Sequence, residues 1–419
     1  MTVVDARWPS LDLEHRQWPE PGHDLAGPPT RRRDRLHDRL HDRLRDRVPG
    51  SFEAAVPPSI AQRPVGCGPA VAAVLDAAAQ AVVALDASTT VDLTALAGAL
   101  LRSESVASSK IEHLSASQAE VGLAMLRGVP VHAAAAHVAA NVRAMTAALA
   151  QGDEQREYHV ADVLALHRLL LEADPYEGGW AGRVRDMQNW VGGGDRSPHG
   201  ALFVPPAPQR VPGLLDDLVR FCRRTDVHPV AQAAVAHAQF ETIHPFTDGN
   251  GRTGRALVHV VLRRRGLARR TVVPVSTVLL ADVEGYFEGL DDYRAGRLDA
   301  WLARFAAATS VAASAGQGLA NDLAAVRQGW YEAVRPRRGS AVATLTEALL
   351  RQPVVDIDVL RTLAGGVADT NVYAAVSRLE AAGVLTELSG GGRNQVWAAL
   401  DVLDLLERFE TRLGRRRPF

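Results

Sequence analysis

The twelve residues His244–Arg255, HPFTDGNGRTGR, decide how the rest of the chain is interpreted. An apolar helical pattern runs into this stretch from Val230, and a second helical pattern leaves it toward Leu262. Between the two patterns the sequence is rich in glycine, which supports a sharp backbone turn. The stretch therefore predicts two helices joined by a tight turn at the centre of a mainly helical fold.

The turn itself has the composition of a phosphate-binding site. Gly249 and Gly251 flank Asn250, so the backbone can turn and present its N–H groups without obstruction. Those groups stand at the start of the second helix, where the helix dipole favours anions. Arg252 and Arg255 are three residues apart, so they share one helix face and can bind neighbouring phosphates.

Two further side chains in the stretch supply chemistry. Asp248 is a hard oxygen ligand suited to Mg²⁺ on a nucleotide. His244 is the one group in the stretch that can accept a proton near neutral pH. A base, a metal ligand, an amide turn and two arginines so close together predict nucleotidyl or phosphoryl transfer.

The stretch resembles the Fic family signature, His-x-Phe-x-Asp/Glu-Gly-Asn-Gly-Arg-x-x-Arg, at every fixed position. The resemblance covers about residues 50–315 and implies a protein adenylyltransferase, which transfers AMP from ATP to a Tyr, Ser or Thr hydroxyl of a target protein. It implies that His244 is the base and that Asp248 holds Mg²⁺. The nucleotide-binding residues that it implies within the stretch are Phe246, Gly249, Asn250, Gly251, Arg252 and Arg255.

A second resemblance concerns inhibition. Ser108 and Glu112 are four residues apart and face one way on a helix. They resemble the family's inhibitory motif, Ser/Thr-x-x-x-Glu-Gly/Asn, which implies that Glu112 pairs with Arg255 where the nucleotide's γ-phosphate would bind. His113 departs from the motif, because the family has a small residue there that helps to end the helix. An ordinary surface glutamate is the alternative interpretation of Glu112.

Two more segments resemble family features. Residues 279–287 resemble the segment near the adenine pocket, so Asp282 and Tyr286 could touch the base or ribose, although packing and helix capping explain them equally well. Strand-like runs at 183–191 and 201–206 surround a glycine-rich turn and predict a hairpin. The resemblance implies a flap that docks the target segment by strand addition, and a surface hairpin without a role is the alternative.

The whole chain has 419 residues, a hydrophobic fraction of 47% and a net charge of −1. Its length favours two to four domains of about 100–200 residues each, and its net charge argues against a chain that binds nucleic acid by charge alone. We predict a mainly α fold, a Fic helical bundle with a small β-hairpin flap and a C-terminal winged-helix domain. The predicted segments are a tail (1–48), an N-terminal helical region (49–150), a Fic catalytic core (151–315), a linker helix (316–339) and a winged-helix-like domain (340–413).

We expect no signal peptide at the N-terminus of this sequence. Residues 1–30 predict an irregular lead, and a charged repeat at 31–48 predicts a solvated helix or, as the alternative, a partner-docking helix. The apolar run 71–87 is interrupted by aspartates, so we expect no membrane partner and a soluble cytoplasmic protein. Cys67 and Cys222 both lie in apolar sequence and are expected to be buried thiols.

The C-terminal segment has a separate pattern. Helical stretches near 341–350, 358–363 and 370–382 precede two strand-like runs at 384–388 and 395–399, which is the order of a winged helix. DNA reading would place 370–382 in the major groove. Six arginines against ten acidic residues give Ser340–Gly414 a charge of −4, which opposes phosphate binding. This charge favours a role in protein docking, with DNA binding as the alternative.

Other functions remain open on the residues alone. The same site could remove AMP from a target, and a winged-helix regulator could use the Fic part to sense nucleotide. A family branch that phosphorylates targets resembles His-x-Phe-x-x-Ala-Asn-Lys-Arg, and Gly249 and Gly251 argue against that branch. A homodimer is common among similar proteins.

Overall fold

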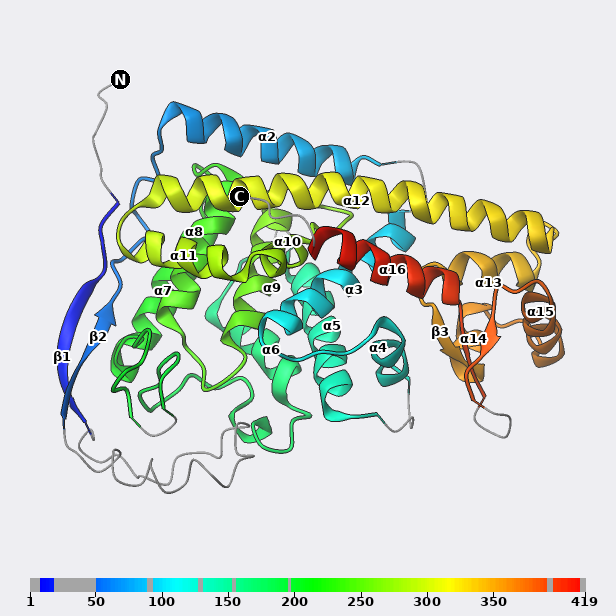
Figure 1. Ribbon diagram of the computed structural model, residues 1–419, viewed down its shortest axis with the longest axis horizontal. Helices are drawn as coiled ribbons and strands as arrows, with labels where there is room; N and C mark the ends of the chain where they lie inside the picture. The colour runs from blue at the N-terminus through cyan, green and yellow to red at the C-terminus, as the bar shows by residue number, and fades with distance from the viewer. Residues whose placement is uncertain are drawn as a thin grey trace. The chain divides into compact units, whose positions relative to one another are not determined.

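The computed structural model describes residues 8–18, 50–88, 93–126, 131–152, 156–194, 197–389 and 395–414. This part of the chain is mainly helical with two small antiparallel sheets, which confirms the predicted mainly α fold class (Figure 1). The charged repeat predicted at 31–48 lies outside the described residues, as do residues 390–394 between the two predicted strands of the C-terminal segment.

The elements have the following bounds. The helices are α2 (Pro69–Asp86), α3 (Leu93–Ile111), α4 (Gln118–Ala124), α5 (Ala133–Gln151), α6 (Val160–Leu171), α7 (Val211–Cys222), α8 (Pro229–Ile243), α9 (Asn250–Arg264), α10 (Val275–Ala281), α11 (Val283–Arg294), α12 (Leu298–Val334), α13 (Ala341–Leu349), α14 (Ile357–Leu363), α15 (Asp369–Ala381) and α16 (Leu400–Gly414). Short 3₁₀ turns are η1 (Gly178–Trp180) and η2 (Pro208–Arg210). The strands are β1 (Asp12–Trp18), β2 (Gly50–Val56), β3 (Val354–Asp356), β4 (Thr386–Glu387) and β5 (Val396–Ala398).

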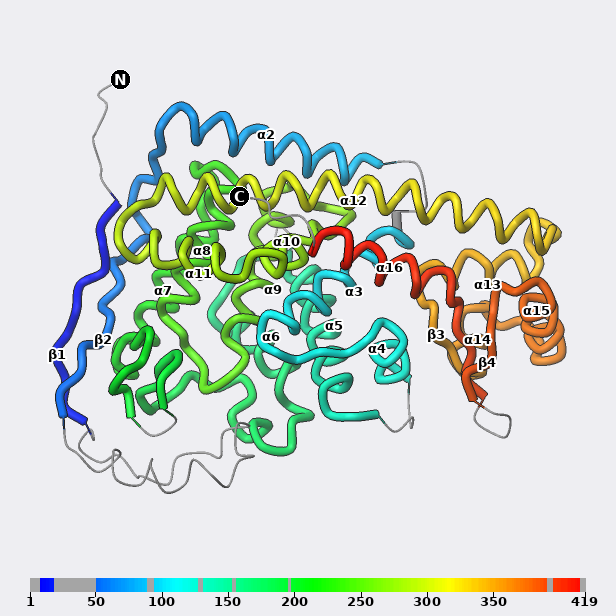
Figure 2. Tube along the Cα trace, viewed as in Figure 1, coloured from blue at the N-terminus to red at the C-terminus, as the bar shows by residue number. Residues whose placement is uncertain are grey.

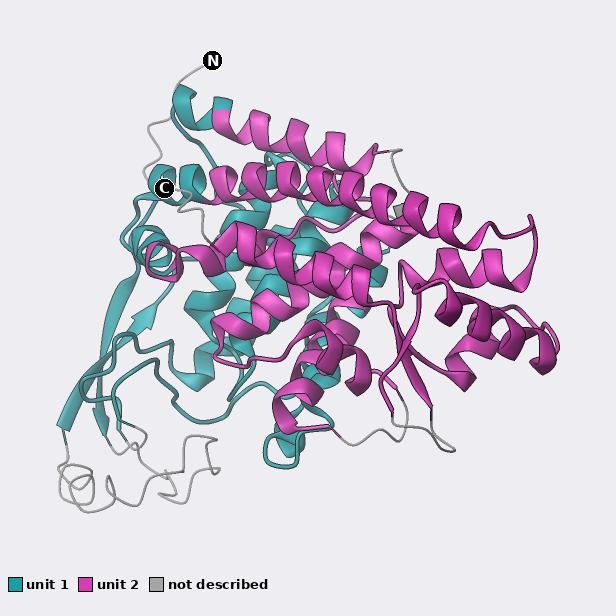
Figure 3. Ribbon diagram, turned by 45° about the vertical axis from the view of Figure 1, so that its right-hand side comes forward, with its two compact units in different colours: residues 1–73, 147–265, 287–304 teal, residues 74–146, 266–286, 305–419 magenta. Residues whose placement is uncertain are grey.

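The chain divides into two compact units, coloured separately in Figure 3. Unit 1 comprises residues 1–73, 147–265 and 287–304, and unit 2 comprises residues 74–146, 266–286 and 305–419. The motif His244–Arg255 belongs to unit 1. The domain boundaries given above from the sequence stay predictions.

Helix α8 is the buried centre of unit 1. It begins with Pro229, whose fixed φ suits the first turn of a helix, and every residue from Val230 to Ile243 is buried. Small alanines let neighbouring helices approach it closely, and side chains from other segments hydrogen-bond to it. The Trp301 indole donates to the Ala234 carbonyl at 2.9 Å, and the Tyr293 hydroxyl donates to the Gln239 side chain at 2.8 Å. A helix fixed on all sides can hold the motif rigidly at its C-terminal end.

Strand β1 runs antiparallel to β2 along one side of unit 1, with Asp12 opposite Val56 and Trp18 opposite Gly50 (Figures 1 and 2). The expectation of an irregular lead is therefore wrong for residues 12–18. The surrounding prolines led to this wrong expectation, because the strand forms only by pairing with β2, more than thirty residues away. The buried Trp18 ring packs edge-on against Trp190 at 5.4 Å and completes the attachment.

The predicted hairpin at 183–206 is reduced to one isolated antiparallel bridge between Val191 and Phe203. The amide of Val191 donates to the Phe203 carbonyl at 2.8 Å, and Ala55 of β2 donates to the Val204 carbonyl at 2.9 Å. The returning limb of the hairpin therefore hydrogen-bonds to β2 as well as to its own partner limb.

Unit 2 contains α3, which is tied to two other elements of this unit. The buried Glu104 carboxylate accepts from the Ser276 amide of α10 at 2.8 Å. Lys110 forms an ion pair with Glu410 of α16 at 2.7 Å, and Gln118 donates to the same carboxylate. The end of α3 is therefore fixed to the C-terminal helix by charged and polar contacts.

The segment after α12 contains α13, β3, α14, α15, β4 and β5, with the strands in the order β3-β5-β4. This is the predicted element order with β3 added, a strand of three residues that sequence periodicity did not indicate. Helix α12 ends at Val334 because Arg335 has a left-handed φ of 47° and Pro336 follows it. The assignment of this segment to winged-helix proteins stays a prediction.

Helix α2 corrects one statement drawn from the sequence. By length and composition alone it is apolar enough to cross a membrane, contrary to our expectation, although a single helix of this kind is weak evidence. Its 18 residues would span about 27 Å, slightly less than a bilayer core of about 30 Å. Asp86 at its end accepts the amides of Arg270 and Thr271 at 2.8 Å, which anchors the helix within unit 2.

The two cysteines differ in burial. Cys222 is buried on α7 as expected, and burial raises the pKa of its thiol to about 12. Cys67 is exposed, so the expectation of a buried thiol is wrong there. Its neighbours Gly66 and Gly68 contribute no side chains to cover it.

Candidate active site

The motif loop joins α8 to α9 through two left-handed residues. His244 has φ 49° and ends α8, and Gly249 has φ 74° and precedes the first residue of α9. A Cβ on Gly249 would lie 2.9 Å from Leu170 Cδ2, so both the conformation and the space there require glycine. The left-handed conformation costs a non-glycine residue such as His244 about 1–2 kcal/mol, so surrounding contacts must hold it.

Arg185 supplies most of those contacts. Its buried guanidinium donates from Nε to the His244 carbonyl at 2.8 Å, and from Nη2 to the Ile243 carbonyl at 3.4 Å. Further bonds run to the Met187 carbonyl at 3.0 Å and to the Pro206 carbonyl at 2.6 Å. One side chain therefore satisfies the last carbonyl of α8 and fixes the backbone of His244.

The middle of the loop is held at Phe246 and Asp248. The Asn250 side chain accepts from the Phe246 amide at 2.9 Å and donates to its carbonyl at 2.8 Å, and Asn189 donates to the same carbonyl at 2.9 Å. The ring of Phe246 is fully buried and stacks on His167, with centroids 3.7 Å apart. His167 also hydrogen-bonds the Asp248 carbonyl at 3.0 Å. Phe246 is thus turned into the core, and the Asn250 side chain holds the loop.

Arg252 carries the strongest indication of an anion-binding site. Only 1% of its side chain is exposed, and one nitrogen, Nη2, lies 3.2 Å from Asp248 Oδ2. Its Nε and Nη1 are buried and have no hydrogen-bond partner among the described residues. Leaving a buried donor unpaired costs about 1–3 kcal/mol, more for a charged group. A phosphate at the positive end of α9 would satisfy these donors.

The surroundings of His244 set its protonation. Burial, together with the positive charges of Arg185 and Arg294, lowers the pKa of His244 to about 3. The residue remains half-buried, so solvent reaches part of it. At neutral pH the imidazole is unprotonated and able to accept a proton, and a polyanion bound nearby would raise its pKa.

Asp248, the predicted metal ligand, belongs to no larger group of metal-binding side chains among the described residues. The Asp248 side chain is 40% exposed, and the described residues contain no cluster of three or more His, Cys, Asp or Glu side chains suited to a metal. Mg²⁺ is commonly held by one or two carboxylates together with substrate phosphates. The single carboxylate therefore fits a metal that arrives on a nucleotide and does not fit a metal held by protein ligands alone.

The remaining predicted residues lie in unit 2. Ser108 is buried in α3, and Glu112 is exposed one residue beyond the end of this helix. Asp282 accepts from the Gly285 amide at 3.1 Å in the first turn of α11, and Tyr286 is 1% exposed. The structure thus brings the motif residues together within unit 1 and places Ser108, Glu112, Asp282 and Tyr286 in the other unit.

The end of α3 has a defined geometry. His113 has a left-handed φ of 60°, the Leu114 amide donates to the Ser109 carbonyl, and the His113 amide donates to the Lys110 carbonyl, both at 3.0 Å. The Leu114–Ser109 bond spans five residues, and such a bond is typical of a helix C-terminus that usually ends in glycine. Glycine or asparagine would adopt this left-handed conformation with less strain than His113 does.

Sequence reasoning missed three side chains that hold the loop, namely His167, Arg185 and Asn189. His167 offered a signal, because it lies on the apolar stripe of α6 with Val163, Leu166 and Leu170, where a polar residue needs a partner. Arg185 and Asn189 offered none, since the sequence predicted a hairpin limb there and indicated no partner for either side chain.

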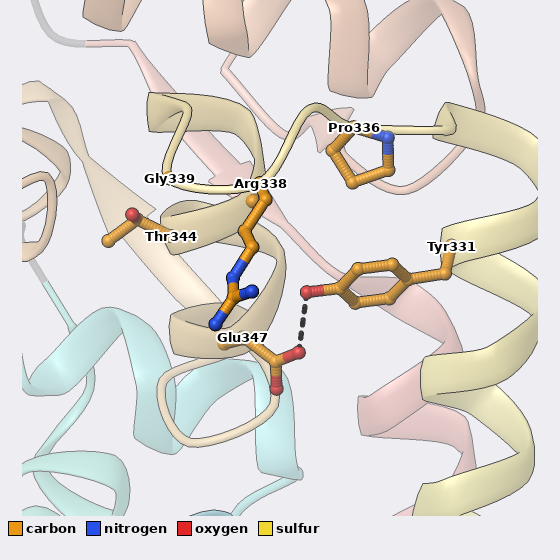
Figure 4. Close-up of a pocket in the computed structure, with 7 residues that line it drawn as sticks. Tyr331, Pro336, Arg338, Gly339, Thr344 and Glu347 are labelled. Atoms are coloured by element: carbon orange, nitrogen blue, oxygen red, sulfur yellow. Dashed lines mark hydrogen bonds between the residues drawn. The ribbon is translucent and has the colours of Figure 1, made fainter.

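A separate shallow pocket of about 350 Å³ lies in unit 2, between the end of α12 and α13. Figure 4 shows the Tyr331 hydroxyl donating to Glu347, at 2.7 Å, and Arg338 beside them. Arg327 also pairs with Glu347, so this carboxylate is already occupied by two donors. None of the residues predicted from the sequence lines this pocket.

Comparison with known proteins gives a family model and two curated relatives. The Fic/DOC family model matches residues 157–262, which contain α6 to α9 except the last two residues of α9. Protein adenylyltransferase fic-1 of Caenorhabditis elegans is 37% identical over 128 residues, 30% of this chain and 23% of that protein. Protein adenylyltransferase Fic of Drosophila ananassae is 38% identical over 117 residues, 27% of this chain and 21% of that protein.

A solved structure is similar over more of the chain. A Fic family protein from Desulfovibrio desulfuricans G20 has a TM-score of 0.50 and 22% identity, and the match covers 81% of this chain and 98% of that chain. At this identity the likeness concerns the fold alone. This chain spans less than a quarter of the length of the curated relatives that it matches.

Proposed function

We propose, from the premise that this chain is a Fic family protein with its Fic/DOC domain at residues 157–262, that it transfers AMP from ATP to a hydroxyl of a target protein. The names of the curated relatives support transfer of an adenylyl group. The observation that carries the proposal is the buried guanidinium of Arg252 at the start of α9, where Nε and Nη1 have no partner among the residues that the structure describes.

The reaction uses groups of the motif loop. His244, unprotonated at neutral pH, accepts the proton of a Tyr, Ser or Thr hydroxyl. The hydroxyl oxygen attacks the α-phosphorus, a new P–O bond forms, and the bond to the bridging oxygen breaks to release pyrophosphate. Arg252 neutralises charge on the departing group, and the first amides of α9 bind phosphate oxygens.

Asp248 would hold Mg²⁺ together with the nucleotide phosphates. When bound, the ion neutralises phosphate charge and orients the phosphates for displacement. The pairing of Asp248 with Arg252 keeps the carboxylate beside the arginine that binds the phosphates. The resemblance to the family is the basis for proposing that Asp282 and Tyr286 contact the adenine base or the ribose.

The decisive experiment compares wild type with His244→Ala in the presence of Mg²⁺ and α-labelled ATP. Loss of the base should lower the rate of AMP transfer by on the order of 10²–10⁴-fold. His159→Ala is the matched control, because His159 is exposed at the start of α6. Transfer by His244→Ala at the wild-type rate would refute the assignment. The same labelled target, incubated with unlabelled protein, tests whether AMP removal is the faster reaction.

The target is proposed to dock on the hairpin that carries the Val191–Phe203 bridge. Leu202 supports this, because its side chain is 86% exposed on a limb whose neighbours are partly buried. Leu202→Ser should lower labelling of the target while ATP binding stays unchanged, since the residue is outside the motif. Equal labelling by this variant would exclude docking through Leu202.

Inhibition by Glu112 is also part of the proposal. Its support is the resemblance of Ser108 and Glu112 to the inhibitory motif and the rigid end of α3 that carries the glutamate. Glu112→Gly should raise AMP transfer, and Glu112→Gln should raise it as well if the negative charge is what inhibits. Wild-type activity in both variants would remove this part of the proposal.

The C-terminal segment is proposed to dock protein. The arginine of α15 that would face DNA, Arg378, donates to the Val334 carbonyl at 2.6 Å and to the Arg335 carbonyl at 3.1 Å. Arg361 is paired with Asp358 and Asp369. A DNA-binding regulator is the second candidate, and tight, strongly salt-dependent binding to duplex DNA would favour it instead.

Sedimentation of the full chain tests a proposed homodimer.

A further inference from the structure

His167 occupies a position where one imidazole joins three parts of unit 1. It lies on α6 with no exposed surface. Nδ1 accepts from the Gly182 amide, and Nε2 hydrogen-bonds to the Asp248 carbonyl. The face of the ring stacks on the Phe246 ring. No sequence motif assigned it a role.

The two hydrogen bonds fix the tautomer of the ring. The Gly182 amide is only a donor, and it lies 3.0 Å from Nδ1, so Nδ1 must be the unprotonated nitrogen. Nε2 then carries the proton and donates it to the Asp248 carbonyl at 3.0 Å. The bond to Asp248 therefore has one direction, and it requires a donor at this position of the side chain.

Two neighbouring contacts restrict the loop at the same place. The ring of His167 is parallel to that of Phe246, with planes 3° apart, so the residue two positions before Asp248 cannot move independently. On the other side, Gly249 packs against Leu170, one turn further along α6. The peptide that follows Asp248 is thus held between His167 and the left-handed turn at Gly249.

We propose that His167 is a positioning residue for Asp248, which orients the carboxylate toward a divalent cation on the bound nucleotide by holding the Asp248 carbonyl. This rests on the proposed function. Without the Nε2–H bond the Asp248–Gly249 peptide can rotate, and the carboxylate loses its fixed direction. The effect should therefore fall on metal-dependent binding of the nucleotide more than on binding of the nucleotide alone.

Two conservative variants separate the two hydrogen bonds. In His167→Asn the side-chain amide ends at the position of Nδ1, so it can still accept from Gly182 but cannot reach Asp248. In His167→Gln the amide nitrogen ends at the position of Nε2, so it can donate to the Asp248 carbonyl. His159→Asn, at the exposed start of α6, is the matched control.

The measurement is calorimetric binding of ATP to the full chain, in MgCl₂ and in EDTA. His167→Asn should weaken binding about tenfold in MgCl₂, the effect of one lost hydrogen bond, and by less than about threefold in EDTA. His167→Gln and His159→Asn should stay within about threefold of wild type in both conditions.

Several results would overturn the inference. They are an unchanged affinity of His167→Asn in MgCl₂, an equal loss in both conditions, and a tenfold loss in MgCl₂ for His167→Gln. If His167→Asn does not fold, His167→Gln decides alone by the same limits. Wild type that binds no ATP in either condition refutes the proposed function and this inference together, whereas normal wild-type binding with a failed variant pattern refutes the inference alone.

Discussion

Replacing Arg185 should damage both the stability of unit 1 and the chemistry at His244. The guanidinium is 2% exposed and donates to four carbonyl oxygens, three of them within 3.0 Å, so no water can take its place without rearrangement. Arg185→Met removes every one of these donors while keeping much of the side-chain volume. Arg185→Lys keeps the charge but offers one nitrogen in place of three.

The magnitude follows from the bonds. A hydrogen bond to a charged group contributes about 1.5–3 kcal/mol, and three such bonds do not add fully. We expect Arg185→Met to lower the free energy of unfolding by about 4 kcal/mol and Arg185→Lys by about 2 kcal/mol, since the ammonium can reach only some of the carbonyls. Arg183→Met is the control, because Arg183 is exposed two residues away and should change stability by less than about 0.5 kcal/mol.

Urea denaturation followed by tryptophan fluorescence measures the first effect. With a slope of about 3 kcal/mol per molar urea, the midpoint of Arg185→Met should fall by roughly 1 M. The effect on His244 should appear in the pH profile of the proposed AMP transfer, where losing the positive charge should move the acidic limb to higher pH. Arg185→Met with the midpoint of Arg183→Met and an unshifted profile would refute the claim that this side chain holds the loop.

Three further predictions concern single residues. His113→Gly should raise the free energy of unfolding by about 1 kcal/mol, because glycine adopts φ 60° without strain; a lower melting temperature would contradict this. Burial lowers the pKa of His167 to about 4, below its unfolded value of about 6.5. The free energy of unfolding should therefore fall by about 3 kcal/mol from this group as the pH drops from about 6.5 to about 4, and the fall should be shallower in His167→Gln. Asp86→Ala should cost about 2–3 kcal/mol and speed hydrogen exchange at Thr271, since Asp86 accepts from both the amide and the hydroxyl of Thr271; unchanged exchange would contradict the anchoring of α2.

Local pattern was sufficient for the helices that hold the motif. The apolar run before His244 and the glycines after it predicted α8 and α9, and the observed bounds differ from the predicted ones by only a few residues. Helix α7, Val211–Cys222, is amphipathic in the same way, with Leu215, Leu218 and Cys222 buried at helical spacing. These elements are determined by residues close in sequence, so periodicity and capping residues are enough to find them.

Pairing between distant segments could not be read in the same way. Strand β1 exists because Asp12–Trp18 pairs with Gly50–Val56, and β3 is three residues long and pairs with β5, about forty residues further along the chain. The predicted hairpin kept one bridge, because its returning limb also bonds to β2. Tertiary contacts decide such strands, and a single sequence does not contain them in periodic form.

The same limit applies to the site. The motif named the groups that are proposed to bind a ligand, but further side chains that hold the loop came from α6 and from residues 185–189. Their partners are backbone carbonyls, which carry no residue identity and so leave no trace in a motif. A buried polar residue on an apolar helix face, as at His167, is the one signal of this kind that a sequence offers.

Arg185 also connects the shape of the loop to the basicity of His244. The C-terminal end of a helix is negative and favours a protonated histidine, which would be useless as a base. Arg185 donates to the carbonyls of Ile243 and His244, the last of α8, and its charge is one cause of the low pKa of His244. The bonds that hold the strained backbone therefore also cancel the negative end of the helix. A triphosphate bound at α9 would offset part of this positive charge, so His244 should become a stronger base when the nucleotide is present.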